Sequence, residues 1–355
     1  MKPAGYVATR LMSLVASAAG SHSIRTVDAM PCGMPERVAM YMLASRPVAT
    51  APPAVAFVDN NTSAAVPRLL AALDEVGATP DDVKYIIVTH AHLDHAAGTG
   101  TLLEHCRAAT VLCHPRAKRH LVDPKALIDS ARRVYSPEEF AAQVGDMIPC
   151  AADRVRAVAD GETFDLAEGR PLRFIHTEGH AKHHCIIHDP TTSSVFTGDN
   201  FGVSYDDAAA YGLAPGTLLP TTSPIDFDYT AAAAAVRVIE DLPVLRAWPT
   251  HFGPVEDVAD GAAQLRPLLA RMESLRRRMS LSLQAGDAPE TVLAAGEAAV
   301  LRIYKETFAA RGLRDDVPAS FWTERMGPEV TVNTLGLLVA AQRHPVSAEG
   351  NLSKL

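Results

Sequence analysis

The chain has 355 residues, of which 48% are hydrophobic and 21% are charged, and both values are those of ordinary globular proteins. Disorder of the whole chain is therefore excluded, and no stretch approaches the roughly 20 apolar residues that span a bilayer. The formal net charge of -8 provides no basic surface for nucleic acid or anionic lipid, so we expect neither partner.

The first 58 residues give only weak indications of a targeting segment and of secondary structure. Lys2 and Arg10 precede a short apolar stretch that serines interrupt, which resembles a secretory signal only faintly and leaves export open. We treat residues 1–23 as an N-terminal segment of uncertain structure. From residue 24 to 58, short apolar runs are broken by Pro and Gly and end in a predicted strand, 55–58.

A helix and further strands follow in order. Leu69, Leu70 and Leu73 have helical spacing and predict a helix over 67–76. Residues 83–89 are rich in β-formers and nearly continuously apolar, which predicts a strand buried on both faces. The remaining strand-like runs are 109–113, 172–177, 185–188, 194–197 and 244–248.

The character of the sequence changes near residue 256. Helical patterns cover 264–279, 289–311 and 330–342, and the alanine run 231–235 also suits a helix. We therefore predict a main domain of strands and helices over 24–256 and a helical C-terminal extension over 257–355, which could serve as a lid or as the face of a homodimer.

The strongest chemical signal directly follows the predicted strand 83–89. His90 and His92 alternate on extended backbone and can face one point, while the turn into Ala96-Ala97-Gly98 brings Asp94 and His95 beside them. Imidazole and carboxylate are ligands of Zn, Fe(II) and Mn, and their closeness would be costly without a cation. The pattern predicts a metal site, whereas a polar loop with scattered histidines is the simpler alternative.

These residues form an HxHxDH motif, which resembles that of the metallo-β-lactamase superfamily. Further motifs of that family follow in order: Thr177-Glu178-Gly179-His180, Phe196-Thr197-Gly198-Asp199 and Pro249-Thr250-His251. Upstream, Phe57-Val58-Asp59 resembles the first motif. The resemblance covers residues 24 to 255 and implies an α/β (α+β) fold, the αββα four-layer sandwich. Glu178 stands where the family usually has proline.

The resemblance also implies ligand roles. It assigns His90, His92 and His180 to one metal ion, Asp94, His95 and His251 to another, and Asp199 to a bridge between them. Two divalent transition-metal ions are implied, Zn first, with Fe or Mn as alternatives. Asp94 and Asp199 would be the catalytic carboxylates, and Asp59 would support the site from outside the ligand set.

A few other residues are candidates for supporting roles. His184 could hold a ligand or contact substrate, and Tyr205 could line the pocket, although a core histidine and an ordinary loop tyrosine are equally open. We interpret His183 as structural and Cys185 as a buried strand cysteine. The five cysteines form no CxxC pair, which favours a reducing compartment and hence the cytoplasm.

The complete ligand set most resembles the glyoxalase II-like branch, which implies hydrolysis of an ester, thioester or lactone by a metal-bridging hydroxide. The partner would be a small-molecule substrate. An iron-dependent persulfide dioxygenase of the same fold is the main alternative. A nuclease is disfavoured by the acidic charge, and a non-catalytic metal-containing binding module by the presence of every expected ligand.

Overall fold

The computed structural model describes all residues except 1–8, 18–19, 47–51, 133–135, 225 and 347–355. The chain divides into two compact units. The first unit comprises Met1–Thr177, His183–Asp199 and Leu242–Val258, and the second unit comprises Glu178–Lys182, Asn200–Asp241 and Ala259–Leu355. Short 3-10 helices lie at Pro31–Gly33, Ser63–Ala65, Pro80–Asp82, Ala152–Arg154, Pro190–Thr192 and Asp206–Tyr211.

The larger sheet of the first unit follows chain order. Its strands are β1 (Thr9–Ser17), β2 (Gly20–Asp28), β3 (Ala39–Arg46), β4 (Ala54–Val58), β5 (Val83–Val88), β6 (Thr110–Cys113) and β7 (Val155–Ala157). Neighbours are antiparallel from β1 to β4 and parallel from β4 to β7. The parallel strands bring Asp59, Thr89 and His114 to one edge of the sheet, because each follows the carboxyl end of its strand.

Strand β5 agrees with its predicted bounds but only partly with its predicted burial. Ile86, Ile87 and Val88 are buried, whereas Lys84 is exposed and donates a hydrogen bond from Nζ to the carbonyl oxygen of Asp165 at 2.7 Å. The prediction of a strand buried on both faces is therefore wrong for its first half.

The second sheet of this unit has the order β14-β11-β10-β9-β8. Its strands are β8 (Thr163–Ala167), β9 (Arg170–His176), β10 (Cys185–Asp189), β11 (Ser194–Gly198) and β14 (Arg246–Pro249). The four strands predicted in this region correspond to β9, β10, β11 and β14. Asp199 directly follows β11, and His251 follows β14 by two residues.

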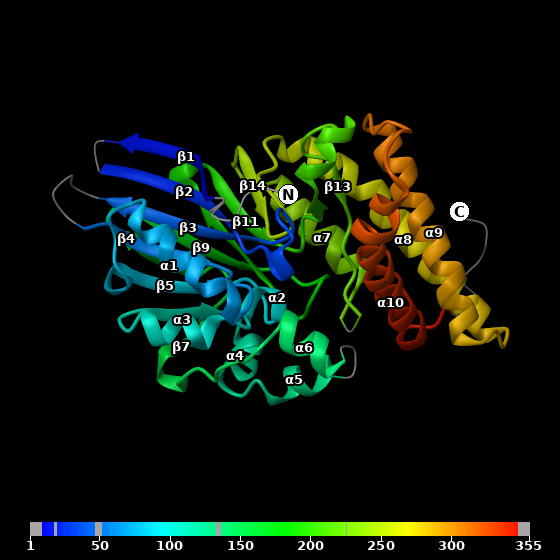
Figure 1. Ribbon diagram of the computed structural model, residues 1–355, viewed down its shortest axis with the longest axis horizontal. Coiled ribbons are helices and arrows are strands. Elements are labelled where there is room, and N and C mark those ends of the chain that lie inside the picture. Colours follow the sequence, from blue (N-terminus) through cyan, green and yellow to red (C-terminus); the bar gives the residue numbers. More distant parts are fainter. Residues whose placement is uncertain (1–8, 18–19, 47–51, 133–135, 225, 347–355) are drawn as a thin grey trace. The chain divides into compact units, whose positions relative to one another are not determined.

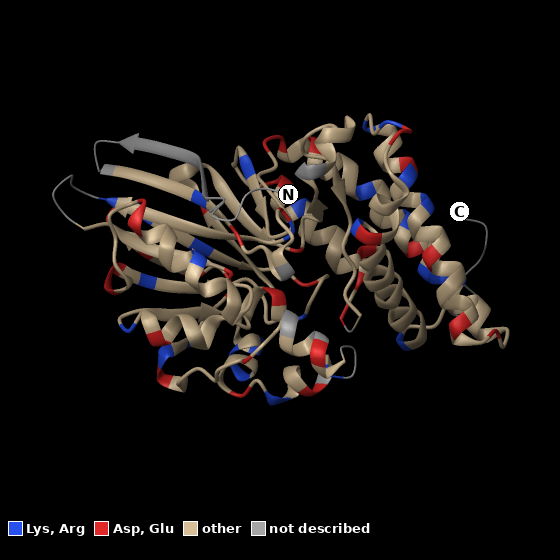
Figure 2. Ribbon diagram, in the orientation of Figure 1, with Lys and Arg blue, Asp and Glu red and all other residues tan. Residues whose placement is uncertain are grey.

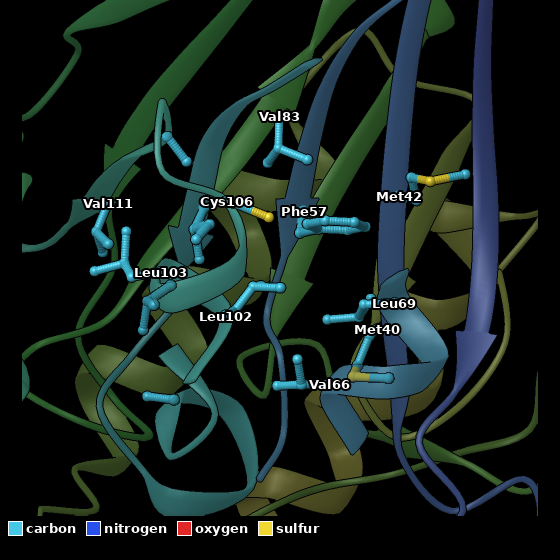
Figure 3. Close-up of a cluster of buried hydrophobic side chains, with 14 of the residues drawn as sticks. Met40, Met42, Phe57, Val66, Leu69, Val83, Leu102, Leu103, Cys106 and Val111 are labelled. Carbon is cyan, nitrogen blue, oxygen red and sulfur yellow. The ribbon is translucent and has the colours of Figure 1, made fainter. Parts of the chain in front are cut away.

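Helices cover the outer face of the larger sheet. They include α1 (Val66–Asp74), α3 (Thr99–His105) and α4 (Pro115–Val122), while α2 (Leu93–Ala96), α5 (Lys125–Ala131) and α6 (Pro137–Gln143) are short. Figure 3 shows the core beneath them, where Met40, Phe57 and Leu69 pack together. The opposite face of the sheet contributes Leu43 and Val58 to a second core shared with residues of the second sheet. Three of the predicted layers, helix, sheet and sheet, thus lie in the first unit.

A buried arginine, paired with an aspartate of its own sheet, connects the two sheets. Arg170 of β9 and Asp189 of β10 are both fully buried, and the guanidinium Nη2 donates to Asp189 Oδ2 at 2.8 Å. Nη1 of Arg170 donates to the carbonyl oxygens of Ser23 on β2 at 3.3 Å and Ala44 on β3 at 2.7 Å. The same side chain therefore neutralises a carboxylate in one sheet and satisfies backbone acceptors in the other.

His114 links the end of β6 to helix α4. Its Nδ1 accepts a hydrogen bond from the backbone N–H of Arg116 at 3.1 Å and so caps the helix. Burial, together with the neighbouring His176 and Arg116, lowers the pKa of His114 to about 4. The imidazole is therefore neutral in the folded protein under conditions where an unfolded chain would already bind a proton.

We expect His114→Asn to reduce the loss of stability in acid. Between pH 6.5 and about 4 the unfolded state binds a proton at His114 that the folded state does not, so stability falls as pH falls through this window. Asparagine can cap the helix but does not titrate. Urea unfolding at pH 7 and pH 5, with chelator present, should show a smaller difference in the variant. An unchanged difference would contradict the assignment, and His105→Asn, at an exposed position, is the control.

The second unit is mainly helical. It contains α7 (Tyr229–Glu240), α9 (Pro289–Ala310), α10 (Gly327–Arg343) and all but the first residue of α8 (Val258–Gln284), with a π-helical turn at Phe321–Arg325 and the short strands β12 (Val203–Ser204) and β13 (Leu218–Leu219). The predicted helices correspond to α7, α8, α9 and α10, so the helical C-terminal region is confirmed. Acidic and basic residues are interspersed along α8 and α9 (Figure 2). Within the described part of the chain, every helix is too short or too polar to cross a membrane.

Candidate metal centre

The candidate site begins where β5 ends. The backbone stays extended through His92, and α2 starts at Leu93, so the chain turns immediately after the second histidine. His90 Nε2 lies 2.9 Å from His92 Nδ1, and the rings of His90 and His95 have centroids 3.9 Å apart. The turn thus gathers the imidazoles of one short segment at a single place.

Two side chains from the second sheet reach the same place. Asp199 Oδ1 lies 3.3 Å from His95 Nε2 and 3.7 Å from His251 Nε2. Asp94 Oδ2 lies 3.2 Å from His251 Nε2. Ligand atoms lie within 4.8 Å of one another in the group His90, His95 and Asp199, and also in the group Asp94, His95 and His251. The first unit therefore brings six of the seven predicted ligands together.

Asp59 holds this arrangement from behind. Its carboxylate is buried and accepts hydrogen bonds from the Thr89 backbone N–H at 2.9 Å and from the hydroxyls of Thr89 and Thr250 at 2.8 and 2.9 Å. It also accepts from His95 Nδ1 at 2.8 Å. Because Nδ1 donates to Asp59, Nε2 is the ring nitrogen that faces Asp199.

His251 is oriented in the same manner. Its Nδ1 donates a hydrogen bond to the carbonyl oxygen of Arg37 at 3.1 Å, so Nε2 faces Asp94 and Asp199. His95 Nε2 is buried and lies 3.3 Å from Asp199 Oδ1. A buried imidazole nitrogen that faces a carboxylate suits a ligand of a cation. The donors therefore fit a transition-metal site.

The charges of the site lead to the same conclusion. Burial lowers the pKa values of His95 and His251, but the carboxylates outweigh it, Asp199 most strongly, and raise that of His251 to about 9 and that of His95 well above its ordinary value. Burial raises the pKa of Asp94, whereas His95 and His251 bring it below its usual range. The carboxylates thus favour a positive charge beside them, which either protons or metal ions can supply.

His92 differs from these two histidines. Burial, together with the nearby His183, lowers the pKa of His92 to about 4. A neutral imidazole keeps a lone pair available at neutral pH, as a metal ligand must.

His184 positions the backbone of Asp199. It is fully buried, its Nε2 accepts the Asp199 N–H at 3.3 Å, and its Nδ1 lies 3.1 Å from the hydroxyl oxygen of Thr177. Gly198 makes this approach feasible, because it has φ +49° and a Cβ there would lie 2.5 Å from His184 Nε2. Cys185 is buried in β10, and burial raises the pKa of its thiol well above the ordinary value, which suits a packing role.

His183, interpreted from the sequence as structural, accepts the backbone N–H of Ala91 on Nδ1 at 3.2 Å, and Ala91 lies between two predicted ligands. Two threonines and one backbone carbonyl that also support the site were not identified from the sequence. Thr89 and Thr250 each immediately precede a motif histidine, and that position is the available sequence signal. The carbonyl of Arg37 has no such signal, because any residue could supply it.

Two predicted site residues belong to the second unit, and their roles stay predictions. His180 is buried, and its Nδ1 lies 3.1 Å from the hydroxyl oxygen of Thr221. Tyr205 is also buried, with the guanidinium carbon of Arg325 4.4 Å from its ring centroid. Burial raises the pKa of the Tyr205 hydroxyl well above its ordinary value.

Comparison with known proteins identifies relatives of this chain. A family model described as metallo-beta-lactamase superfamily matches residues 59–251. The chain is 32% identical over 152 residues to the metallo-beta-lactamase fold-containing protein ST1585 of Sulfurisphaera tokodaii, a match covering 42% of this chain and 52% of that protein. It is 26% identical over 164 residues to the lactamase-like protein aptB of Emericella nidulans, covering 46% and 41% of the two chains. The matches thus span about half the length of these relatives or less.

Solved structures share the fold over more of the chain. The crystal structure of ST1585, described as an archaeal metallo-beta-lactamase superfamily protein from Sulfolobus tokodaii, aligns with a TM-score of 0.57 and 22% identity, covering 88% of this chain and 97% of that one. The metallo-beta-lactamase family protein TTHA1429 from Thermus thermophilus aligns with a TM-score of 0.55 and 18% identity, covering 94% and 93%. A structure described as a peroxy diiron species of the chemotaxis sensor ODP aligns with a TM-score of 0.50 and 15% identity, covering 72% and 93%.

Proposed function

The chain belongs to the metallo-beta-lactamase superfamily, and from this premise we propose that it is a metal-dependent hydrolase of an ester, thioester or lactone. The proposed cofactors are two divalent transition-metal ions, Zn first, with Fe or Mn as alternatives. The proposed substrate is a small molecule, in keeping with the glyoxalase II-like pattern of motifs.

One observation carries this proposal. His95 and His251 each donate from Nδ1 to a fixed oxygen, of Asp59 and of Arg37, and each directs Nε2 toward carboxylates. Metal-binding histidines commonly show this division between the two ring nitrogens, which fixes ring orientation before the ion binds. A merely structural histidine cluster would not need two carboxylates facing the same pair of Nε2 atoms.

The two carboxylates of the site have different proposed roles. Asp94 is the more accessible carboxylate, with a side chain 47% exposed against 7% for Asp199, so it can accept a hydrogen bond from an attacking water. Asp199, held through its backbone by His184, would be shared between the ions. When bound, the ions would polarise the substrate carbonyl and make hydroxide available near neutral pH.

The remaining expectations about partners and location are also proposals. The acidic chain, with net charge -8, supports the absence of nucleic-acid and membrane partners. The thiols of Cys106, Cys113, Cys150 and Cys185 are free, which supports a cytoplasmic location. We also keep the proposal that the C-terminal helices form the interface of a homodimer.

The reaction class can be tested with the purified full chain. It should hydrolyse at least one of a panel of acyl-glutathione, acyl-CoA, lactone and aryl ester substrates without consuming oxygen. Chelation should abolish the activity, and Zn, Mn or Fe should restore it to different degrees. Element analysis of protein purified without added metal should find close to two transition-metal ions per chain.

The same experiment separates the alternatives. A glutathione persulfide assay in an oxygen electrode is run in parallel, since one solved neighbour is described as a diiron sensor. Oxygen uptake with persulfide by an iron-loaded sample, without hydrolysis of any panel member, would favour the dioxygenase. Metal binding with no turnover in either assay would favour a non-catalytic binding module.

A further inference from the structure

A short loop of the second unit, residues 221–223, holds His180 at two points. The Thr221 hydroxyl oxygen lies 3.1 Å from His180 Nδ1, and the Ser223 hydroxyl donates to the His180 carbonyl oxygen at 2.7 Å. The His180 backbone N–H donates to Asn200 Oδ1 at 3.1 Å. When His180 Nδ1 donates to the Thr221 hydroxyl, the lone pair of the imidazole lies on Nε2. The loop then determines both the tautomer of His180 and the direction of its ring.

Helix α10 in turn holds this loop. The Asn333 side-chain oxygen accepts the backbone N–H of Thr222, and the Thr222 hydroxyl donates to the Asn333 carbonyl oxygen at 2.6 Å. Asn333 Nδ2 donates to the carbonyl oxygen of Glu329 at 2.8 Å, which sets the orientation of the amide. Asn333 and Thr222 are 2% and 1% exposed, so water offers little replacement for these bonds.

A glycine independently marks the same contact. A Cβ at Gly336 would lie 2.8 Å from the Thr222 hydroxyl oxygen and 2.9 Å from the Ser223 carbonyl oxygen. Both distances are shorter than Cβ atoms tolerate, and one of the two atoms belongs to the backbone. The helix and the loop therefore touch at a position where a side chain does not fit.

We propose that α10 is a positioning element for His180. Asn333 and Gly336 fix Thr222, and the residues on either side, Thr221 and Ser223, then fix the ring and backbone of His180. The proposal rests on the proposed function in one respect, namely that His180 is a metal ligand. It assigns the C-terminal helices a part in metal binding, whereas the sequence suggested only a lid or a dimer face.

The test measures Zn²⁺ affinity of the full chain by competition with a chromogenic chelator. Asn333→Leu and Gly336→Ala should each weaken the affinity for one Zn²⁺ equivalent by about 10–100-fold, as loss of the contacts that orient a ligand commonly does. Gly327→Ala in the same helix is the matched control, because a Cβ there would meet its nearest atom only at 3.8 Å. It should leave the affinity unchanged.

A double-mutant cycle distinguishes positioning of His180 from general damage. In a His180→Gln background, Asn333→Leu should have no further effect on Zn²⁺ affinity, because its effect acts through the histidine. Thr221→Val removes the hydroxyl beside His180 and leaves α10 unchanged. It replaces Asn333→Leu in the cycle if that variant folds poorly. Nitrogen NMR of the His180 ring, assigned by its loss in His180→Gln, should show a changed tautomer population in Thr221→Val and Asn333→Leu.

The outcomes separate this proposal from the hydrolase assignment. A full effect of Asn333→Leu in the His180→Gln background, or an unchanged His180 ring spectrum, would overturn the positioning role. Unchanged Zn²⁺ affinity in His180→Gln would remove the ligand role on which it rests. Coupled affinities without hydrolysis of any substrate would support the positioning role while contradicting the proposed reaction.

Discussion

Asp199→Ala is expected to lower metal occupancy and hydrolytic activity together, with both losses larger than for any other single change in the site. Its carboxylate lies near His95 and His251, and it raises the pKa of His95 more than any other neighbouring group does. Loss of contacts outside a ligand set costs about 10–100-fold in affinity, so loss of a shared ligand should cost at least that much. Element analysis and initial rates on the same preparation measure both quantities.

Asp165→Ala is the matched control for this prediction. Asp165 is an exposed aspartate of β8, and the hydrogen bond from Lys84 uses its backbone oxygen, which alanine retains. It should keep parental metal content and rate. If Asp199→Ala retained two metal ions and full turnover, the bridging role would be wrong.

The largest effect on stability is expected for Arg170→Met. The change leaves the fully buried Asp189 carboxylate without its countercharge and removes two bonds to the backbone of the other sheet. Breaking a buried pair from one side costs about 3–5 kcal/mol. Urea unfolding can be followed through Trp248, which is buried in the first unit and is the one tryptophan left in a Trp322→Phe background.

Two further variants test whether the effect of Arg170→Met arises from the buried charge. Adding Asp189→Leu to Arg170→Met should recover part of the lost stability, because the uncompensated charge is then gone. Lys125→Met breaks an exposed ion pair with Asp129 and should leave the unfolding midpoint unchanged. An Arg170→Met midpoint equal to that of the parent would show that water or a rearranged side chain replaces the guanidinium.

The sequence predicted several strands whose side chains are apolar, although the apolar strand β3 was not identified as a separate strand. Strands β4, β5, β10 and β11 are short runs dominated by apolar or β-branched residues, and their positions agree with prediction within a few residues. Strand β2 was missed because its burial depends on polar residues. His22, for example, is buried through a hydrogen bond between its Nδ1 and the hydroxyl of Ser45 at 2.7 Å. Hydrophobic periodicity gives no signal for such a strand.

The candidate site also has a part that the sequence predicted and a part that it did not. The candidate ligands could be named from the sequence because four lie within six residues and the others lie in short motifs that follow strands. The groups that orient them could not, since Arg37 contributes a carbonyl and the Thr221 hydroxyl reaches His180 across 41 positions of the chain. Contacts of this kind depend on tertiary structure, which no local pattern encodes.

The hydrogen bonds of Asp59 also set an order of events during synthesis. Its first partner, Thr89, emerges from the ribosome soon after Asp59, but Thr250 lies 191 residues after Asp59 in the chain. Domains fold largely as units once their sequence is available. A nascent chain that ends before β14 therefore has the HxHxDH segment but lacks both Thr250 and His251. If the candidate metal centre binds its ions as proposed, it can be completed only after most of the protein has been translated.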